Sequence, residues 1–262
     1  YEIGSTHQRR VTSGSFSIKT PSGKTSRQIS VPIDANGTYL MTLFARSQDG
    51  VIRIKKEIPF SRVIALEPEG EPTPIKIGVQ THLAHGQGFL HETMELVQKG
   101  GFGWVRDEMY WGEAEPKKGE VKTFYDWDRR LEEASKKGIG HLIGLTFGNN
   151  LYDQGGPPYT EEGIAAYARY AATLAEKYKG QITYFEVWNE YNNPGGFNKT
   201  NRPPEDYARM LEAVYKAVKA VNPDAVILGG ATVWVDLPWF ERVLKAGGHP
   251  YMDAVSIHPY SV

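Results

Sequence analysis

The sequence predicts an α/β protein built on a parallel sheet, either an open sheet or a (β/α)₈ barrel, preceded by a partial β-sandwich domain. Three observations predict this. Strand-like apolar runs alternate with amphipathic helical segments over residues 75–262, shorter alternating segments fill residues 1–66, and the run Glu67-Pro68-Glu69-Gly70-Glu71-Pro72-Thr73-Pro74 separates the two parts. Because this run is acidic, rich in proline and poor in apolar residues, we predict an extended linker over residues 67–74.

Composition limits the function before any motif does. The 262 residues are 40% hydrophobic and 23% charged, with a formal net charge of -1. The near-neutral chain has no basic run typical of nucleic-acid binding, and no apolar stretch approaches the roughly 18 residues of a membrane helix. Zero cysteines exclude disulfides and thiolate sites but leave the compartment open. We therefore expect a globular protein with a small neutral ligand, no nucleic-acid partner and no membrane span.

The N-terminal part, residues 1–66, alternates apolar and polar residues near 15–19, 29–33, 39–44 and 51–54, which predicts four strands. The segments 34–37 and 48–50 supply the turns between them. This pattern is typical of an immunoglobulin or fibronectin-like sandwich, although such domains have about seven strands. We therefore predict a partial sandwich that lacks its beginning.

The larger part, residues 75–262, contains six predicted strands, near 75–80, 104–108, 141–146, 182–187, 225–229 and 254–257. Between them, apolar residues at helical spacing predict amphipathic helices. These residues are Leu90, Met94 and Val97, then Ile164, Tyr167, Ala168, Ala171 and Ala175, then Tyr207, Leu211, Val214 and Val218. No Gly-x-Gly-x-x-Gly fingerprint follows the first strand, which argues against a dinucleotide-binding fold.

The most informative stretch is Glu186-Val187-Trp188-Asn189-Glu190-Tyr191, at the end of the apolar run 182–187. In a βα barrel, the carboxyl ends of the strands form the face that carries the active site. Aromatic neighbours such as Trp188 and Tyr191 would desolvate a carboxyl group and raise its pKa, as a general acid requires. Asn and Glu are also common in turns, so the pair alone is equally compatible with a structural role.

Several strand ends together carry a family resemblance. The second strand ends Trp104-Val105-Arg106-Asp107-Glu108 and is followed by residues 111–119, the fourth ends Trp188-Asn189-Glu190, and the sixth ends Ser256-Ile257-His258-Pro259-Tyr260. Over residues 75–262 the chain resembles the clan A glycoside hydrolases, which are retaining (β/α)₈ barrel enzymes. It looks most like family 39 and its exopolysaccharide-degrading relatives, with families 5 and 42 as alternatives. The resemblance implies a glycosidase with about six of the eight barrel units in this chain.

The resemblance also implies roles for individual residues. Glu190 would be the general acid/base, and Asn189 would hydrogen-bond the sugar hydroxyl next to the anomeric carbon. Arg106 would lie low in the pocket and hold a carboxylate ionised, or else be a rim partner of a neighbouring acidic residue. Tyr260 would donate its hydroxyl to the nucleophile, and His258 would line the same wall.

The nucleophile is the main departure from the family. It should be a Glu at the end of the seventh strand, whereas the sequence stops after the sixth. We therefore expect missing chain, with the nucleophile outside these residues and the isolated chain inactive. A second chain that carries the rest of the barrel is one expected partner, and the carbohydrate substrate is the other.

Further substrate contacts are predicted from residues that follow strand ends. Trp111 and Trp234 would stack on sugar rings, Asn149 would hydrogen-bond hydroxyls, and His82 follows the first strand. Two other functions are open: a non-catalytic carbohydrate-binding protein, and a metal-dependent enzyme that uses His82, Glu190 and His258. The preferred interpretation includes no metal and no cofactor, and places the protein in an extracellular or periplasmic location.

Overall fold

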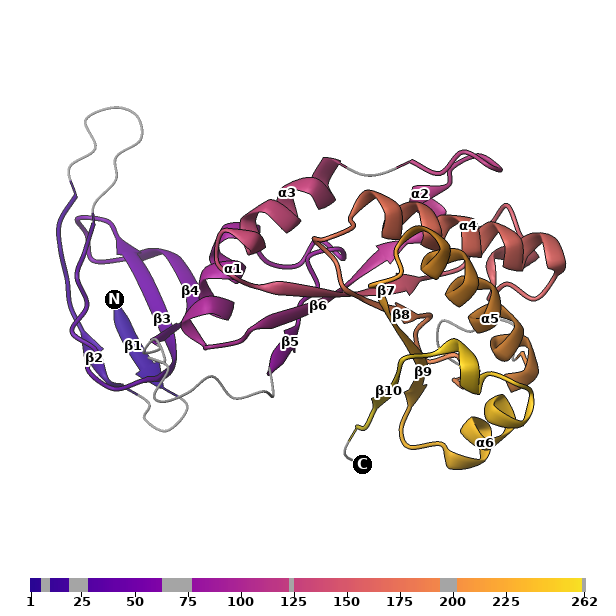
Figure 1. The fold of residues 1–262 in the computed structure, drawn as a ribbon. Coiled ribbons are helices and arrows are strands. Elements are labelled where there is room, and N and C mark those ends of the chain that lie inside the picture. Colours follow the sequence, from indigo (N-terminus) through magenta and orange to yellow (C-terminus); the bar gives the residue numbers. More distant parts are fainter. Residues whose placement is uncertain (6–9, 19–27, 63–76, 123–124, 194–201, 261–262) are drawn as a thin grey trace. The chain divides into compact units, whose positions relative to one another are not determined.

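The computed structural model describes residues 1–5, 10–18, 28–62, 77–122, 125–193 and 202–260 (Figure 1). The chain divides into two compact units, Tyr1–Glu67 and Pro68–Val262. The predicted linker 67–74 lies outside the described residues. Within the described residues, none of the helices combines the length and apolar character needed to cross a membrane.

The first unit contains one antiparallel sheet in the order β2-β1-β3-β4. Its strands are β1 (Glu2–Ser5), β2 (Thr12–Ser13), β3 (Gly37–Arg46) and β4 (Ile52–Arg62). The predicted strand at 39–44 lies within β3, and the predicted strand at 51–54 overlaps the start of β4. The predicted turn at 48–50 joins them, with a hydrogen bond of 2.9 Å from the Gly50 amide to the Ser47 carbonyl.

Two strand predictions in this unit were wrong. Residues 15–18 and 28–33 form no strand. Instead, β1 pairs with β3 on one side and with β2 on the other. Alternation marks residues that suit a sheet, but the sheet forms only where a partner strand supplies hydrogen bonds. Pro32 moreover lacks the backbone N–H that a paired strand donates.

The second unit contains a six-stranded parallel sheet in the order β10-β9-β8-β7-β6-β5, so that strands adjacent in sequence are also adjacent in space. All six predicted strands are confirmed. They are β5 (Gly78–Gln80), β6 (Trp104–Tyr110), β7 (Gly140–Thr146), β8 (Tyr184–Val187), β9 (Val226–Val233) and β10 (Ala254–His258). This strand order is the order found in a (β/α)₈ barrel.

Helices cover the outer side of this curled sheet (Figure 1). The larger ones are α1 (Leu90–Lys99), α3 (Tyr125–Ser135), α4 (Glu161–Lys177), α5 (Pro204–Val221) and α6 (Leu237–Lys245), with shorter elements α2 (Trp111–Ala114), η1 (Asp153–Gly155) and η2 (His249–Tyr251). The residues predicted to form the apolar faces of α1, α4 and α5 are buried, except Leu90, which is partly buried. The curled parallel sheet and its helices thus fit a partial barrel.

Tyrosine hydroxyls join the helices to the carboxyl ends of the strands. Tyr170 and Tyr167 of α4 donate to the carbonyls of Met109 and Leu145, each at 2.5 Å. Tyr207 of α5 donates to the Val187 carbonyl at 3.0 Å. Because these phenols are fully buried, each hydrogen bond fixes the end of a strand against the helix layer.

The opposite face of the sheet is polar at alternate positions. Arg106 and Glu108 of β6, Glu186 of β8, and Ser256 and His258 of β10 share this face, since side chains two apart along a strand point the same way. These three strands are alternate members of the sheet, as expected for one layer inside a barrel. The polar layer lies beside the strand ends where the sequence predicts the site.

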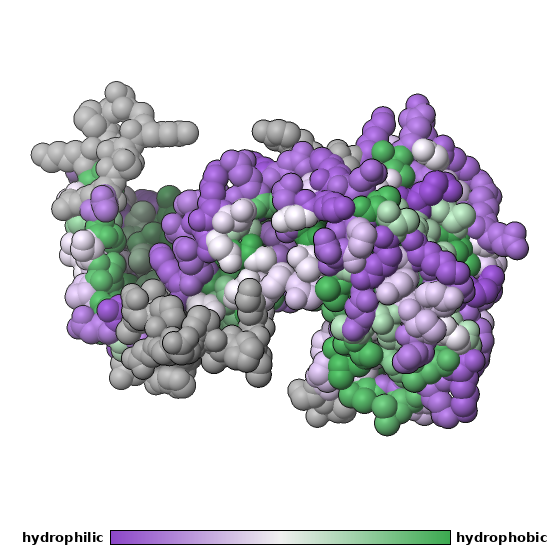
Figure 2. Space-filling view, in the orientation of Figure 1, coloured by the Kyte–Doolittle hydropathy of each residue, from purple (hydrophilic) through white to green (hydrophobic). Residues whose placement is uncertain are grey.

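Apolar side chains are also exposed near the β10 edge of the sheet. Figure 2 shows hydrophobic residues gathered around α6. The exposed large apolar residues of this region are Trp234, Val235, Leu237, Leu244, Val255, Ile257 and Tyr260.

Candidate active site

The backbone around Asn189 has an unusual conformation. Trp188 and Glu190 have φ angles of 72° and 52°, in the left-handed region that non-glycine residues seldom adopt. Trp188 is fully buried against the rings of Tyr167 and Tyr191, and the Glu190 amide donates to the Ala231 carbonyl at 2.6 Å. Such strain costs about 1–3 kcal/mol per residue and persists only where packing enforces it, often at functional sites.

Arg106 connects β6 to the Asn189 segment. Its Nε donates to Glu186 Oε2 at 2.8 Å, and its Nη2 donates to the same oxygen and to Asn189 Oδ1, the latter at 3.0 Å. Its Nη1 donates to Gln80 Oε1 at 2.7 Å and to Glu108 Oε1 at 3.2 Å. Because Arg106 occupies the oxygen of the Asn189 amide, the NH₂ group is the end available to donate to a ligand.

Gly144 of β7 lies between these partners. Its strand pairs with β6 on one side and β8 on the other, with Gly144 opposite both Glu108 and Glu186. A Cβ at this position would be 3.4 Å from Arg106 Nη2 and 3.3 Å from Glu108 Cγ. The missing side chain leaves room for the guanidinium to cross β7 and reach Glu186.

Glu186 is the buried anion of the site, with 1% of its surface exposed. Its Oε1 accepts from the Ser256 hydroxyl and lies 3.3 Å from His258 Nε2. Burial disfavours the ionised carboxylate, but His258, Arg106 and Ser256 outweigh burial and hold its pKa below the usual range. Burial likewise opposes charge on His258, yet the hydrogen bond and charge of Glu186 raise the pKa of this imidazole.

Glu190 shares His258 with Glu186. Its Oε1 lies 3.2 Å from His258 Nδ1 and accepts from the Tyr260 hydroxyl at 3.0 Å. Burial and the bond to Glu190 both raise the pKa of Tyr260, so the phenol stays protonated and donates. The family resemblance implies that this hydroxyl reaches the nucleophile, but its acceptor in the structure is Glu190. The structure thus brings together Arg106, Asn189, Glu190, His258 and Tyr260 from three strand ends.

Two predicted substrate residues lie in the core instead. Trp111 is fully buried, stacks on Tyr152 with ring centroids 5.2 Å apart, and donates from Nε1 to Glu115 Oε2 at 2.7 Å. Asn149 is 3% exposed, donates to the Glu115 carbonyl at 2.8 Å and accepts from the Leu151 amide at 2.9 Å. The predictions of a stacking platform and of a hydroxyl-binding amide were therefore wrong for these residues, because both side chains organise the loop around buried Glu115.

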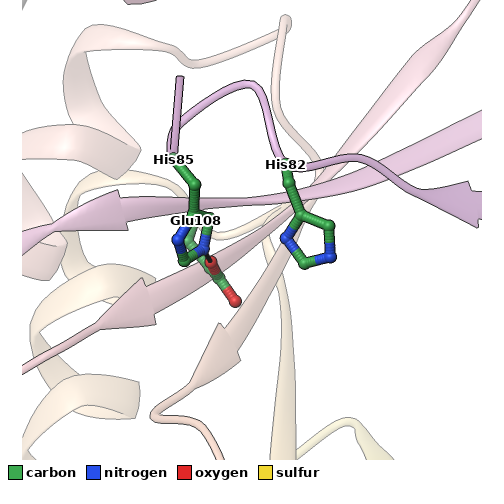
Figure 3. Close-up of side chains that lie close together, drawn as sticks. All are labelled: His82, His85 and Glu108. Carbon is green, nitrogen blue, oxygen red and sulfur yellow. Dashed lines mark hydrogen bonds and ion pairs between the residues drawn. The ribbon is translucent and has the colours of Figure 1, made fainter. Parts of the chain in front are cut away.

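The other two predicted contacts are on the surface. Trp234 is 56% exposed, and its amide donates to the His258 carbonyl at 2.9 Å, so it lies at the end of β10 beside the site. His82 is exposed and lies edge-on to His85 with ring centroids 5.1 Å apart. Among the described residues, His82, Glu190 and His258 do not form a group that could hold a metal ion, whereas His82, His85 and Glu108 do (Figure 3).

Sequence reasoning did not assign a role to Glu186 or Ser256. The signal for Glu186 is present: one carboxylate inside a run that otherwise forms a buried strand must be compensated by a partner. The partner could not be identified from the sequence, because Arg106 lies 80 positions earlier and its side chain must cross a neighbouring strand.

Comparisons with known proteins identify a family and similar folds. The family model described as cellulase, glycosyl hydrolase family 5, matches residues 66–261. No curated protein matches the chain. A family 39 glycoside hydrolase from Bacteroides cellulosilyticus WH2 is 27% identical, with a TM-score of 0.65 over 86% of this chain and 45% of its own.

Two further solved structures show the fold. A family 39 β-xylosidase from Caulobacter crescentus is 20% identical, with a TM-score of 0.56 over 76% of this chain and 50% of its own. The endoglucanase Cel5A from Thermotoga maritima is 20% identical, with a TM-score of 0.51 over 70% of this chain and 60% of its own. The chain spans about half the length of these solved relatives.

Proposed function

The chain belongs to the cellulase family described as glycosyl hydrolase family 5, and from this we propose that it contributes the general acid/base, Glu190, to a retaining glycosidase. The observation that supports this most is the position of Glu190. It follows β8 directly and is hydrogen-bonded by His258 and Tyr260 from β10, while Asn189 beside it is oriented by Arg106 from β6. Three strand ends thus converge where barrel enzymes carry out their chemistry.

The proton transfer follows from these contacts. Because His258 and Tyr260 both hydrogen-bond Oε1 of Glu190, we assign the transferred proton to Oε2. In the first step this proton goes to the glycosidic oxygen as its bond to the anomeric carbon breaks and the nucleophile attacks that carbon. In the second step Glu190, now a carboxylate, takes a proton from the water that displaces the nucleophile. The anomeric configuration is retained after two inversions.

The nucleophile is a second carboxylate, which we place outside this chain. In retaining enzymes the two carboxyl groups are about 5–5.5 Å apart, with the nucleophile free to attack. Glu186 does not meet this requirement, because it is 1% exposed and engaged by Arg106, Ser256 and His258. Glu108 is 5% exposed and engaged by Arg106 and His85.

The substrate proposed is a glucan or xylan, after the family description and the two solved relatives named as an endoglucanase and a β-xylosidase. The test is hydrolysis of cello- and xylo-oligosaccharides by the protein that carries this chain, with Glu190→Gln as the variant. We expect a loss of about 10²–10⁴-fold, the usual contribution of a general acid/base. Exposed Glu113 on α2 provides the control, Glu113→Gln, which should keep wild-type activity.

A second variant separates the two steps. Glu190→Ala should still cleave a dinitrophenyl glycoside in the first step, since this leaving group needs no proton, and azide should restore the second step because it attacks without deprotonation. Full activity of Glu190→Gln would refute the acid/base role. Binding of the oligosaccharides without hydrolysis by the wild type would favour the carbohydrate-binding function instead. Hydrolysis by the 262-residue chain alone would refute the external nucleophile.

A further inference from the structure

We propose that His82, His85 and Glu108 form a binding site for a divalent transition-metal cation, with a donor set suited to zinc. One donor atom from each residue lies within 4.8 Å of the other two. Both histidines belong to the loop between β5 and α1, whereas Glu108 belongs to β6, so the donors come from two separate segments. Figure 3 shows the Glu108 carboxylate beside the His85 ring, on the side that faces His82.

The loop that carries both histidines is attached to the strand that carries the carboxylate. Asp107, next to Glu108, accepts from the Thr81 hydroxyl at 2.9 Å and from the Leu83 amide at 3.0 Å. A turn inside the loop is closed by a hydrogen bond of 3.1 Å from the His85 amide to the His82 carbonyl. These bonds therefore hold the two segments that carry the donors together before a cation arrives, which lowers the entropy cost of binding.

The donor set selects the class of cation. Two imidazole nitrogens and one carboxylate are the ligands of many catalytic zinc sites, with a fourth position open to water. Magnesium and calcium prefer oxygen ligands and would be bound weakly here. With zinc–ligand distances of about 2.0–2.2 Å, tetrahedral ligands lie roughly 3.3 Å apart.

The side chains can reach this spacing with small movements. His85 Nε2 and Glu108 Oε2 are 2.6 Å apart and must separate slightly, while the ring of His82 must approach. The His85 side chain is 32% exposed, and His82 is exposed, so both rings have room to turn. Glu108 stays in place because its other oxygen, Oε1, accepts from Arg106 at 3.2 Å.

The site is independent of the proposed hydrolysis. Cation binding uses only residues at the β5–α1 loop and β6, and it requires neither Glu190 nor a nucleophile. Arg106 joins the two sites through Glu108 and Glu186. Bound zinc would therefore hold the β5–α1 loop against the polar layer without taking part in proton transfer.

His91 and two neighbouring glutamates provide a matched control. His91 of α1 lies near Glu133, with Nδ1 to Oε1 2.8 Å, and near Glu95, with Nε2 to Oε1 3.4 Å. The residue types are the same as in the proposed site, but the two carboxylates face opposite nitrogens of one ring. They cannot converge on one cation, so His91→Ala should leave zinc binding unchanged.

The test is a calorimetric titration of the 262-residue chain with zinc chloride. It is carried out on the wild type and on His82→Ala, His85→Ala and His91→Ala. We expect saturable binding of one zinc ion, weakened at least about tenfold by each of the first two changes and unaffected by the third. Absence of saturable binding, or equal affinity in all four proteins, would overturn the proposal.

Nuclear magnetic resonance of the imidazole groups in the wild type gives a test that needs no variant. Zinc should shift the ring signals of His82 and His85 and leave those of His91 in place. Shifts confined to His91 or other histidines would refute the site. Loss of hydrolysis in Glu190→Gln with unchanged zinc affinity would support both proposals, so the two can fail separately.

Discussion

The two faces of the parallel sheet use polar groups in opposite ways. On the helix-covered face, the buried hydroxyls of Tyr167, Tyr170 and Tyr207 each bond a backbone carbonyl at a strand end. On the other face, Arg106 and Glu186 carry charges that compensate one another inside the layer. The helix-covered face should therefore tolerate the loss of one polar atom better than the charged face, where removal of one partner leaves a buried ion.

The largest effect on stability is expected from Arg106→Met. The change removes the permanently charged partner of Glu186, which is 1% exposed, and leaves it only His258 and Ser256. Removing one member of a buried pair usually costs about 3–5 kcal/mol, since the remaining charge is uncompensated. All six tryptophans lie between residues 104 and 239, so tryptophan fluorescence during urea denaturation measures unfolding of the second unit.

The control for this prediction is Arg242→Met. Arg242 also donates two hydrogen bonds to one carboxylate, Glu205, but both side chains are about half exposed. Water can solvate the carboxylate that remains, so the free energy of unfolding should change far less. Equal losses in the two variants would show that burial of Glu186 does not determine the effect.

A smaller effect is expected from Tyr207→Phe on the helix-covered face. The hydroxyl donates to the Val187 carbonyl at 3.0 Å and accepts from the Gly230 amide at 2.7 Å. Its loss leaves both buried backbone groups unsatisfied, at a cost of about 1–3 kcal/mol in the free energy of unfolding. Tyr215→Phe is the control, because that hydroxyl has an exposed and longer contact, 3.4 Å to Asp253. A loss from Tyr207→Phe greater than that from Arg106→Met would reverse the comparison of the two faces.

The difference between the two faces of the sheet also explains which parts of the fold and site the sequence could predict. The six strands of the second unit were predictable because burial against helices requires apolar runs of strand length. The convergence of Asn189, Glu190 and Tyr260 was predictable because parallel strands end at one edge. In the first unit the strand predictions were wrong at residues 15–18 and 29–33, because alternation does not identify the partner strand.

The directions in which side chains point could not be predicted from the sequence. Trp111 and Trp234 both follow strand ends, yet Trp111 is fully buried over Glu115 and Trp234 is 56% exposed. Position after a strand determines where a residue lies, and the packing of the following turn determines which way it points. The coupling of Glu186 to Arg106 depends likewise on the gap at Gly144, which no local pattern identifies.

The subtlest effect is expected from Glu186→Gln, which should lower the pKa of His258 toward its ordinary value, because Glu186 is the strongest influence that raises it. Glu190→Gln is the matched control and should lower that pKa less.

The raised pKa of His258 adds stability below pH 6.5 that is lost as the pH rises, and the lowered pKa of Glu186 adds stability above pH 4.5 that is lost as the pH falls. The difference in unfolding free energy between wild type and Glu186→Gln should therefore be greatest between pH 4.5 and 6.5. Titration of the His258 ring by nuclear magnetic resonance, with urea denaturation across this range, tests both parts. An unchanged His258 titration in Glu186→Gln would mean that the charged layer does not act as a coupled unit.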